Sequence, residues 1–169
     1  MFDILKQFDF PKNDSRKNIL NNKDEIYKGM ALGEIILIPY WRAIKGTRTM
    51  PCSKLKIKKY KELFDNTNEY FKNNSPEPDF NYTTIQYNKN HKCAKHKDKN
   101  NVGDSYIVGF GDYTGGELIV YDDSGNPTYV DIKNKFYKFN GSKYYHETND
   151  FNGERYTLVF LETQSILLY

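Results

Sequence analysis

The sequence predicts a mainly β fold with an N-terminal helix, arranged as a sandwich or a double-sheet jelly roll. From Phe80 onward, short runs rich in Tyr, Ile, Val, Phe and Thr alternate with turns rich in Gly, Asn and Asp. Upstream of these runs, one stretch carries apolar residues at helical spacing. About eight short strands at such intervals favour stacked antiparallel sheets over a parallel α/β sheet.

The first half of the chain contributes the helix and one strand. Residues 1–30 are polar and predict an irregular arm with a short helix near Lys23–Lys28. The apolar run Gly33–Tyr40 has the length of a strand, and Trp41–Pro51 has the composition of a basic loop. In Lys54–Asn74 the apolar residues recur at helical intervals, so this segment predicts the one long helix.

The second half supplies the strands, which are separated by turn signals such as Asn140–Gly141 and Asn152–Gly153. We expect one domain over 1–169, in which an arm, strand and helix (1–79) precede a jelly-roll core (80–169) and the helix covers one face of the larger sheet. The expected strands are Tyr82–Tyr87, His91–His96, Ser105–Gly109, Glu117–Tyr121, Thr128–Asp131, Lys135–Phe139, Lys143–Glu147 and Arg155–Glu162.

The composition limits the class of protein. The 169 residues are 38% hydrophobic and 16% aromatic, with a mean hydropathy of −0.82, so the aromatic residues must carry much of the core. A formal charge of +3 permits nucleic acid as a partner without requiring it. Two cysteines exclude a disulfide framework. Because the N-terminus resembles no secretory signal and no run is long enough to span a membrane, we expect an intracellular, soluble protein in the cytoplasm or nucleus.

The most informative motif is His96-x-Asp98, followed at a distance by His146. Residues i and i+2 of a strand share a face, so His96 and Asp98 would converge and Lys97 would point away. Two histidines and one carboxylate leave open positions on a metal and are typical of non-haem Fe(II) oxygenases. His91 lies five residues before His96, an odd offset that predicts the opposite face and a surface position.

A second motif, Arg155-x-Thr157, lies in the last expected strand. A guanidinium binds a carboxylate through two parallel hydrogen bonds, and a hydroxyl adds a third, which suits the distal carboxylate of 2-oxoglutarate. The apolar run after Thr157 indicates a buried strand, and a buried arginine requires a partner. The sequence contains no Ser/His/Asp or Cys/His arrangement for nucleophilic catalysis.

Together, the segments HKD, GDYTGGEL, YHET and GERYTLVF resemble the Fe(II)/2-oxoglutarate-dependent dioxygenases, over roughly Tyr82 to Glu162. The resemblance implies a double-stranded β-helix, iron bound by His96, Asp98 and His146, and 2-oxoglutarate held by Arg155 and Thr157. It also implies hydroxylation of a substrate C–H bond by O2, with release of succinate and CO2. The GGEL turn is similar to one in prolyl-hydroxylase-type members and in several uncharacterised algal and viral members.

The resemblance distinguishes branches of this family. Tyr87 matches a tyrosine of the prolyl-hydroxylase pattern, whereas the second tyrosine of that pattern falls on Cys93. Prolyl hydroxylases usually hold the distal carboxylate with lysine, so Arg155 points to the branch with AlkB-like and TET/JBP-like enzymes. Tyr106, in the third expected strand, is a further candidate for contact with the cosubstrate, and a place in the core is its alternative.

Three functions remain open from the sequence. Oxidation of a base in DNA or RNA is favoured by Arg155, by the basic loop Arg42–Lys54 and by the positive charge. Hydroxylation of a protein side chain or a small molecule is favoured by the GGEL turn and Tyr87. A jelly-roll binding module without catalysis is the alternative of another class, because this fold hosts many functions.

Overall fold

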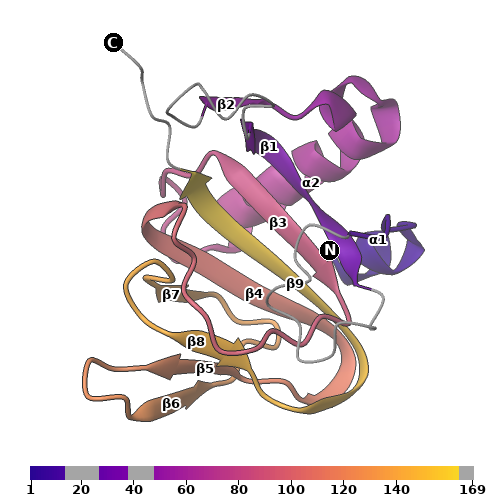
Figure 1. Cartoon of the computed structure of the whole chain (residues 1–169). Helices are drawn as coiled ribbons and strands as arrows, with labels where there is room; N and C mark the ends of the chain where they lie inside the picture. The colour runs from indigo at the N-terminus through magenta and orange to yellow at the C-terminus, as the bar shows by residue number, and fades with distance from the viewer. Residues whose placement is uncertain (14–26, 38–47, 164–169) are drawn as a thin grey trace.

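The computed structural model describes residues 1–13, 27–37 and 48–163, and its strands form two sheets with helices on one side (Figure 1). No helix within these ranges is long and apolar enough to cross a membrane. The helical elements are α1 (Phe2–Gln7), the short 3-10 helix η2 (Ser53–Lys56) and α2 (Lys58–Asn74). The strands are β1 (Lys28–Leu37), β2 (Arg48–Pro51), β3 (Thr84–Lys89), β4 (Asn101–Gly115), β5 (Leu118–Tyr121), β6 (Pro127–Val130), β7 (Tyr137–Phe139), β8 (His146–Thr148) and β9 (Phe151–Thr163).

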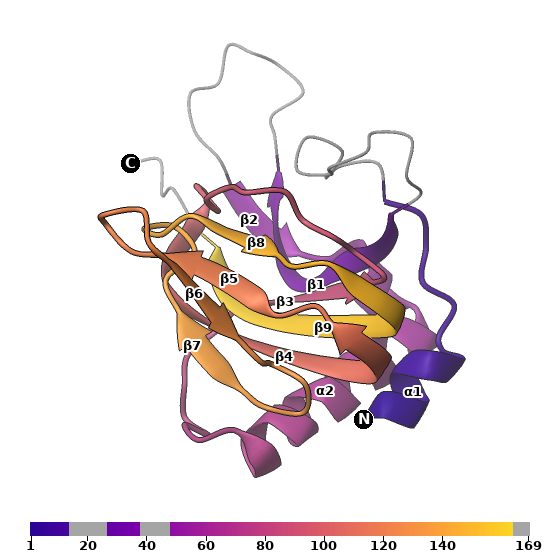
Figure 2. The same cartoon turned by 90° about the horizontal axis from the view of Figure 1, so that it is seen from below.

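The two sheets differ in size. The large sheet has the order β2-β1-β3-β9-β4-β7 and the small sheet the order β6-β5-β8, with antiparallel neighbours throughout. Seen from below, the small sheet lies over one face of the large sheet while α1 and α2 lie behind the other (Figure 2). This confirms the predicted jelly roll, with the helix on the larger sheet.

The long strands β4 and β9 form the centre of the large sheet. They pair from Asn101↔Thr163 to Gly115↔Phe151, with an irregularity between Val102 and Tyr106. Gly111 within β4 has φ +127°, and a Cβ there would lie 2.0 Å from the backbone oxygen of Glu154. Glycine thus allows the two strands to bend together without breaking their pairing.

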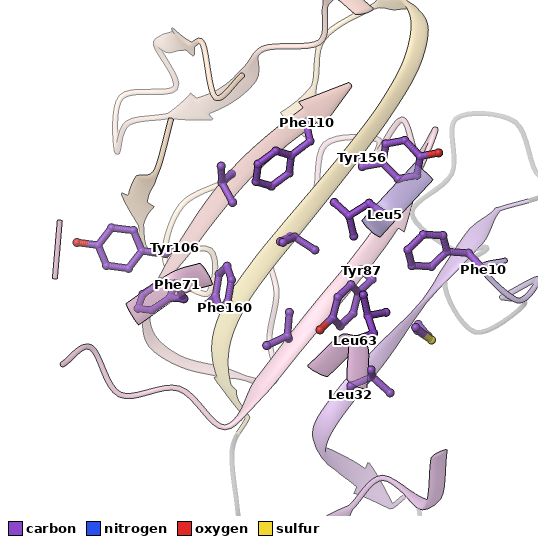
Figure 3. Close-up of a cluster of buried hydrophobic side chains, with 14 of the residues drawn as sticks. Leu5, Phe10, Leu32, Leu63, Phe71, Tyr87, Tyr106, Phe110, Tyr156 and Phe160 are labelled. Atoms are coloured by element: carbon purple, nitrogen blue, oxygen red, sulfur yellow. The ribbon is translucent and has the colours of Figure 1, made fainter. Parts of the chain in front are cut away.

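The main core fills the space between the large sheet and the helices. Directly opposed residues of antiparallel strands share a face, so the pairs Tyr87↔Leu158 and Tyr106↔Phe160 both point to the helix side. Phe71 of α2 meets Phe160 with ring centroids 4.4 Å apart. Figure 3 shows these aromatic rings gathered with aliphatic side chains from α1, α2 and β1. The aromatic residues therefore carry the core, as the composition predicts.

The N-terminal half departs from the prediction in three places. The helix α2 starts at Lys58, after a 3-10 turn, because Ile57 has an extended backbone. A helix, α1, occupies the start of the expected irregular arm, and β2 occupies the end of the expected loop. The short helix near Lys23–Lys28 falls mostly outside the described residues, and Lys28 itself begins β1.

In the second half, the expected strand His91–His96 is wrong. Only Cys93 and His96 form isolated bridges there, because this segment meets its neighbours at single points. The expected turn at Asn152–Gly153 is also wrong, since it lies within β9 and pairs with β4. The remaining expected strands correspond to observed ones with shifted ends, which depend on partners that are distant in sequence.

Candidate metal and cosubstrate site

Backbone pairing brings the three candidate ligands together. His96 and His146 form an antiparallel bridge in which each backbone N–H donates to the other residue's carbonyl at 3.0 Å. The backbone N–H of Asp98 donates to the carbonyl of Gly141 at 2.9 Å. The segment after β3 is thus fixed against the turn that leads into β8, and the three side chains meet although they are distant in sequence.

Both imidazoles face the same carboxylate. The Nε2 atom of His96 lies 3.4 Å from Oδ1 of Asp98, and the Nε2 atom of His146 lies 3.4 Å from Oδ2. One ligand atom from each residue falls within 4.8 Å of the other two. Two imidazole nitrogens and a carboxylate in this arrangement match the ligand set of non-haem Fe(II) sites.

The other nitrogen of each ring faces a backbone carbonyl. The Nδ1 atom of His96 lies 2.7 Å from the carbonyl of Ala94, and that of His146 lies 3.2 Å from the carbonyl of Tyr144. A carbonyl only accepts, so the neutral tautomer with its hydrogen on Nδ1 satisfies each contact and leaves the lone pair of Nε2 for a metal. A Cβ on Gly141 would lie 3.1 Å from Oδ2 of Asp98, so the absent side chain leaves room for the ligands. The residues present therefore fit Fe(II).

The three ligands line one wall of a pocket between the two sheets. Its free space, including the solvent at its open mouth, is about 480 Å³. Both polar and apolar side chains line it: Asn88, His91, Cys93, His96, Asp98, Ile107, Leu118, Phe139, His146, Glu147, Thr148, Arg155, Thr157 and Val159.

Arg155 contributes a buried positive charge to this pocket. Its side chain is 3% exposed, and burial lowers the pKa of the guanidinium. Nη2 donates to the carbonyl of Gly116 at 2.9 Å, and the rings of Tyr113 and Phe151 lie 5.6 and 5.4 Å from Cζ. Within the described part of the chain, the buried Nε has no hydrogen-bond partner. A buried guanidinium with an unused donor fits a carboxylate of a bound molecule.

Thr157 shares the pocket face with Arg155, as the period of two predicts. Its Oγ1 accepts a hydrogen bond from Nδ2 of Asn88 at 3.0 Å. The Oδ1 atom of Asn88 accepts from Tyr27 and from Nε2 of Gln86, which fixes the orientation of the amide. Thr157 is therefore the acceptor in that bond and keeps its own hydrogen to donate elsewhere. The pocket wall thus offers donors to an anion.

The structure does not bring Tyr87 and Tyr106 to this site, which corrects their expected contact with the cosubstrate. Both rings are buried on the helix side of the large sheet, and neither lines the pocket. The hydroxyl of Tyr106 donates to Glu77 at 3.0 Å. Asn88 instead faces the pocket beside Thr157, and the alternation of the strand around Tyr87 is the signal that would have identified it.

The expected surface position of His91 is also wrong. His91 is 3% exposed, its ring centroid lies 4.2 Å from that of Tyr27, and it lines the pocket. The odd offset from His96 predicts a face only within a regular strand, and this segment is not one. His91 remains outside the group of metal ligands.

The two-sheet roll that encloses a His-Asp-His group has the fold of the Fe(II)/2-oxoglutarate oxygenases. One similar solved structure is an oxidoreductase of the 2OG-Fe(II) oxygenase family from Burkholderia pseudomallei, with 12% identity and a TM-score of 0.55 over 96% of this chain and 78% of that chain. Another is NgTET1 in complex with 5mC DNA, with 15% identity and a TM-score of 0.52 over 80% of this chain. The match spans 61% of that NgTET1 chain, less than two thirds. No family model and no curated protein matches the sequence.

Proposed function

We propose that this protein is an Fe(II)- and 2-oxoglutarate-dependent dioxygenase. The observation that carries the proposal is the convergence of His96, Asp98 and His146 within 4.8 Å in the pocket that also buries Arg155. A binding module without catalysis has no need for a metal-ligand group beside a buried carboxylate-binding cation.

Each residue has a role in this proposal. His96, Asp98 and His146 hold the iron, while Arg155 and Thr157 hold the distal carboxylate of 2-oxoglutarate. Bound together, iron and 2-oxoglutarate supply the oxidation of a substrate C–H bond by O2, with release of succinate and CO2. The remaining walls include Ile107, Leu118 and Val159, whose apolar side chains exclude water from the reacting atoms.

We further propose that the substrate is a base of DNA or RNA. The solved NgTET1 structure with this fold contains 5mC DNA, and the present chain carries a formal charge of +3. An enzyme that oxidises a base must bind it outside the base stack, in a pocket of limited size. Hydroxylation of a protein side chain is the competing outcome in the experiment below.

The test is succinate formation with Fe(II), 2-oxoglutarate and pools of DNA, RNA or peptides, followed by mass spectrometry for the gain of one oxygen atom. We expect modified nucleic acid and succinate from the unmodified protein and from Asp104→Ala, because Asp104 is exposed on β4. We expect neither product from Asp98→Ala. Succinate formation by Asp98→Ala at the normal rate would contradict the dioxygenase, and oxygen gained only by peptides would contradict the nucleic-acid substrate.

A further inference from the structure

A second hollow is lined in part by sequence neighbours of the residues that supply the metal ligands. It has a volume of about 400 Å³ and is lined by Lys95, Lys97, Tyr121, Asp122, Asp123, Ser124, Gly125, Lys143, Tyr144 and Tyr145. Lys95 and Lys97 flank His96 in sequence, and Tyr145 precedes His146. None of the metal ligands lines this hollow, which we call the outer cleft.

Ammonium groups lie close to tyrosine rings in the outer cleft. The Nζ atom of Lys95 lies 3.3 Å from the ring centroid of Tyr121 and 5.7 Å from that of Tyr145. The Nζ atom of Lys97 lies 4.6 Å from the ring centroid of Tyr145. Tyr145 is 49% exposed, so an aromatic ring lies at the surface near two cations. This combination offers both stacking and binding of phosphate.

The lysines beside Tyr145 are not neutralised by the acids of the cleft. Asp122 accepts hydrogen bonds from the backbone N–H groups of Ser124 and Asn126, which stabilise its own turn. Asp123 lies 3.9 Å from Nζ of Lys143. In the described ranges, no carboxylate lies within ion-pair distance of Lys95 or Lys97. Their charge is therefore free to attract an anion.

We propose that the outer cleft binds a single-stranded segment of nucleic acid, with phosphates at Lys95 and Lys97 and an unpaired base on Tyr145. An acidic peptide would use the lysines but would have no group to stack on the exposed ring. This inference rests on the proposed function for its biological meaning, because it assigns the cleft to the substrate strand. The cleft borders the segments that supply the metal ligands, because Lys95 and Lys97 flank His96 and Tyr145 precedes His146.

The experiment is fluorescence anisotropy of labelled oligo-dT with the full chain over a range of salt concentrations. We expect Lys95→Ala/Lys97→Ala to weaken binding and to reduce the slope of log K against log[salt] by about 1.4, since each phosphate contact on a single strand contributes about 0.7. The charge-matched control is Lys58→Ala/Lys61→Ala on α2, whose lysines are exposed on the other side of the large sheet. This control should keep both the affinity and the slope.

Two further variants test the stacking. We expect Tyr145→Leu to weaken oligo-dT binding about ten-fold and Tyr145→Phe to keep it, because the ring carries the contact and the hydroxyl does not. Equal losses in both tyrosine variants would overturn the assignment. So would equal weakening by the two lysine pairs, or tighter binding of poly-glutamate than of oligo-dT.

Turnover of 2-oxoglutarate without substrate separates this inference from the proposed function. We expect the Lys95→Ala/Lys97→Ala variant to form succinate at the normal uncoupled rate. If the protein binds oligo-dT through the cleft but forms no succinate with Fe(II), the proposed dioxygenase function is wrong and the proposed binding by the cleft is retained. Normal turnover without binding of oligo-dT would disprove the cleft alone.

Discussion

The two faces of the large sheet are built from the same strands and have different chemistry. On the helix side, Tyr87, Leu158 and Phe160 are buried in an apolar and aromatic core. On the side of the small sheet, their neighbours Asn88 and Thr157 are also buried but are polar and line the pocket. Alternation along β3 and β9 thus separates stability from binding, residue by residue.

The energetic consequences of the two faces differ in sign. Apolar burial stabilises the folded chain on the helix side. On the pocket side, burying Arg155 and Asn88 costs free energy that hydrogen bonds offset only in part, since Nε of Arg155 lacks a partner in the described residues. A bound anion would supply what is missing there. We therefore expect the polar residues of the pocket face to lower the stability of the free protein and to raise its affinity for an anion.

The largest expected effect comes from the metal ligands. His96→Ala should lower turnover of 2-oxoglutarate more than about 100-fold, because loss of a ligand exceeds the effect of losing an outer hydrogen-bond partner. The thermal unfolding of the metal-free protein should change little, since His96 belongs to the pocket and not to the core. A succinate assay with Fe(II) and 2-oxoglutarate measures the turnover, and a melting curve measures the thermal unfolding. If the His96→Ala variant unfolds, the pocket face also contributes to stability, and the two faces of the large sheet do not have separate roles.

On the helix side, Phe160→Ala should lower the free energy of unfolding by about 3–5 kcal/mol. Phe160 is fully buried, and its ring lies 4.4 Å from Phe71 and 5.1 Å from Tyr82. Urea denaturation measures the loss, and Val159→Ala, one residue away on the pocket face, is the control with a smaller expected loss. The affinity of folded Phe160→Ala for Fe(II) should stay normal, and a lowered affinity would show that the core also positions the ligands.

Arg155→Met should weaken the binding of 2-oxoglutarate without lowering the stability of the fold, the opposite of what we expect for Phe160→Ala. We expect the affinity for 2-oxoglutarate to fall about 10- to 100-fold, as loss of hydrogen bonds to a charged group predicts. The free energy of unfolding should stay the same or rise, because a buried charge is replaced by an apolar side chain of similar length. Calorimetric titration and urea denaturation check the two expectations, and strong destabilisation would assign Arg155 to the structure instead.

The sequence predicts the fold class and the metal ligands because both depend on robust patterns. Alternating apolar residues and turn signals indicate the roll, and His96-x-Asp98 with His146 indicates the ligand group, which the backbone brings within 4.8 Å. Arg155 and Thr157 follow from the period of two in β9, which runs as one strand over Phe151–Thr163. These features need no knowledge of which strands become partners.

Features that depend on register could not be predicted in the same way. Shifting a strand by one residue exchanges its faces, so matching Tyr87 to a family pattern placed it in the pocket, where the structure has Asn88. His91 was misplaced because a strand period was applied to a segment held only at single bridges. Both errors come from pairing partners that lie far away in the sequence.

The smallest expected effect concerns Asn88, which acts on the pocket through Thr157. In Asn88→Asp, the new carboxylate only accepts, so it should take the hydrogen of the Thr157 hydroxyl and remove a donor from the pocket. We expect the KM for 2-oxoglutarate to rise by up to about ten-fold, the equivalent of one ordinary hydrogen bond, with kcat unchanged. Steady-state succinate assays over a range of 2-oxoglutarate concentrations measure both constants.

A double-mutant cycle separates the hydrogen bond from the added charge. If Asn88 acts through the hydroxyl, Asn88→Asp should raise the KM less in a Thr157→Val background than in the natural chain, because that donor is already absent. Thr157→Ser keeps the hydroxyl and should preserve the full effect. An equal rise in all three backgrounds would mean that the new carboxylate repels the cosubstrate directly. Asn88 would then be only a wall of the pocket, and the donor face would depend on Arg155 and Thr157 alone.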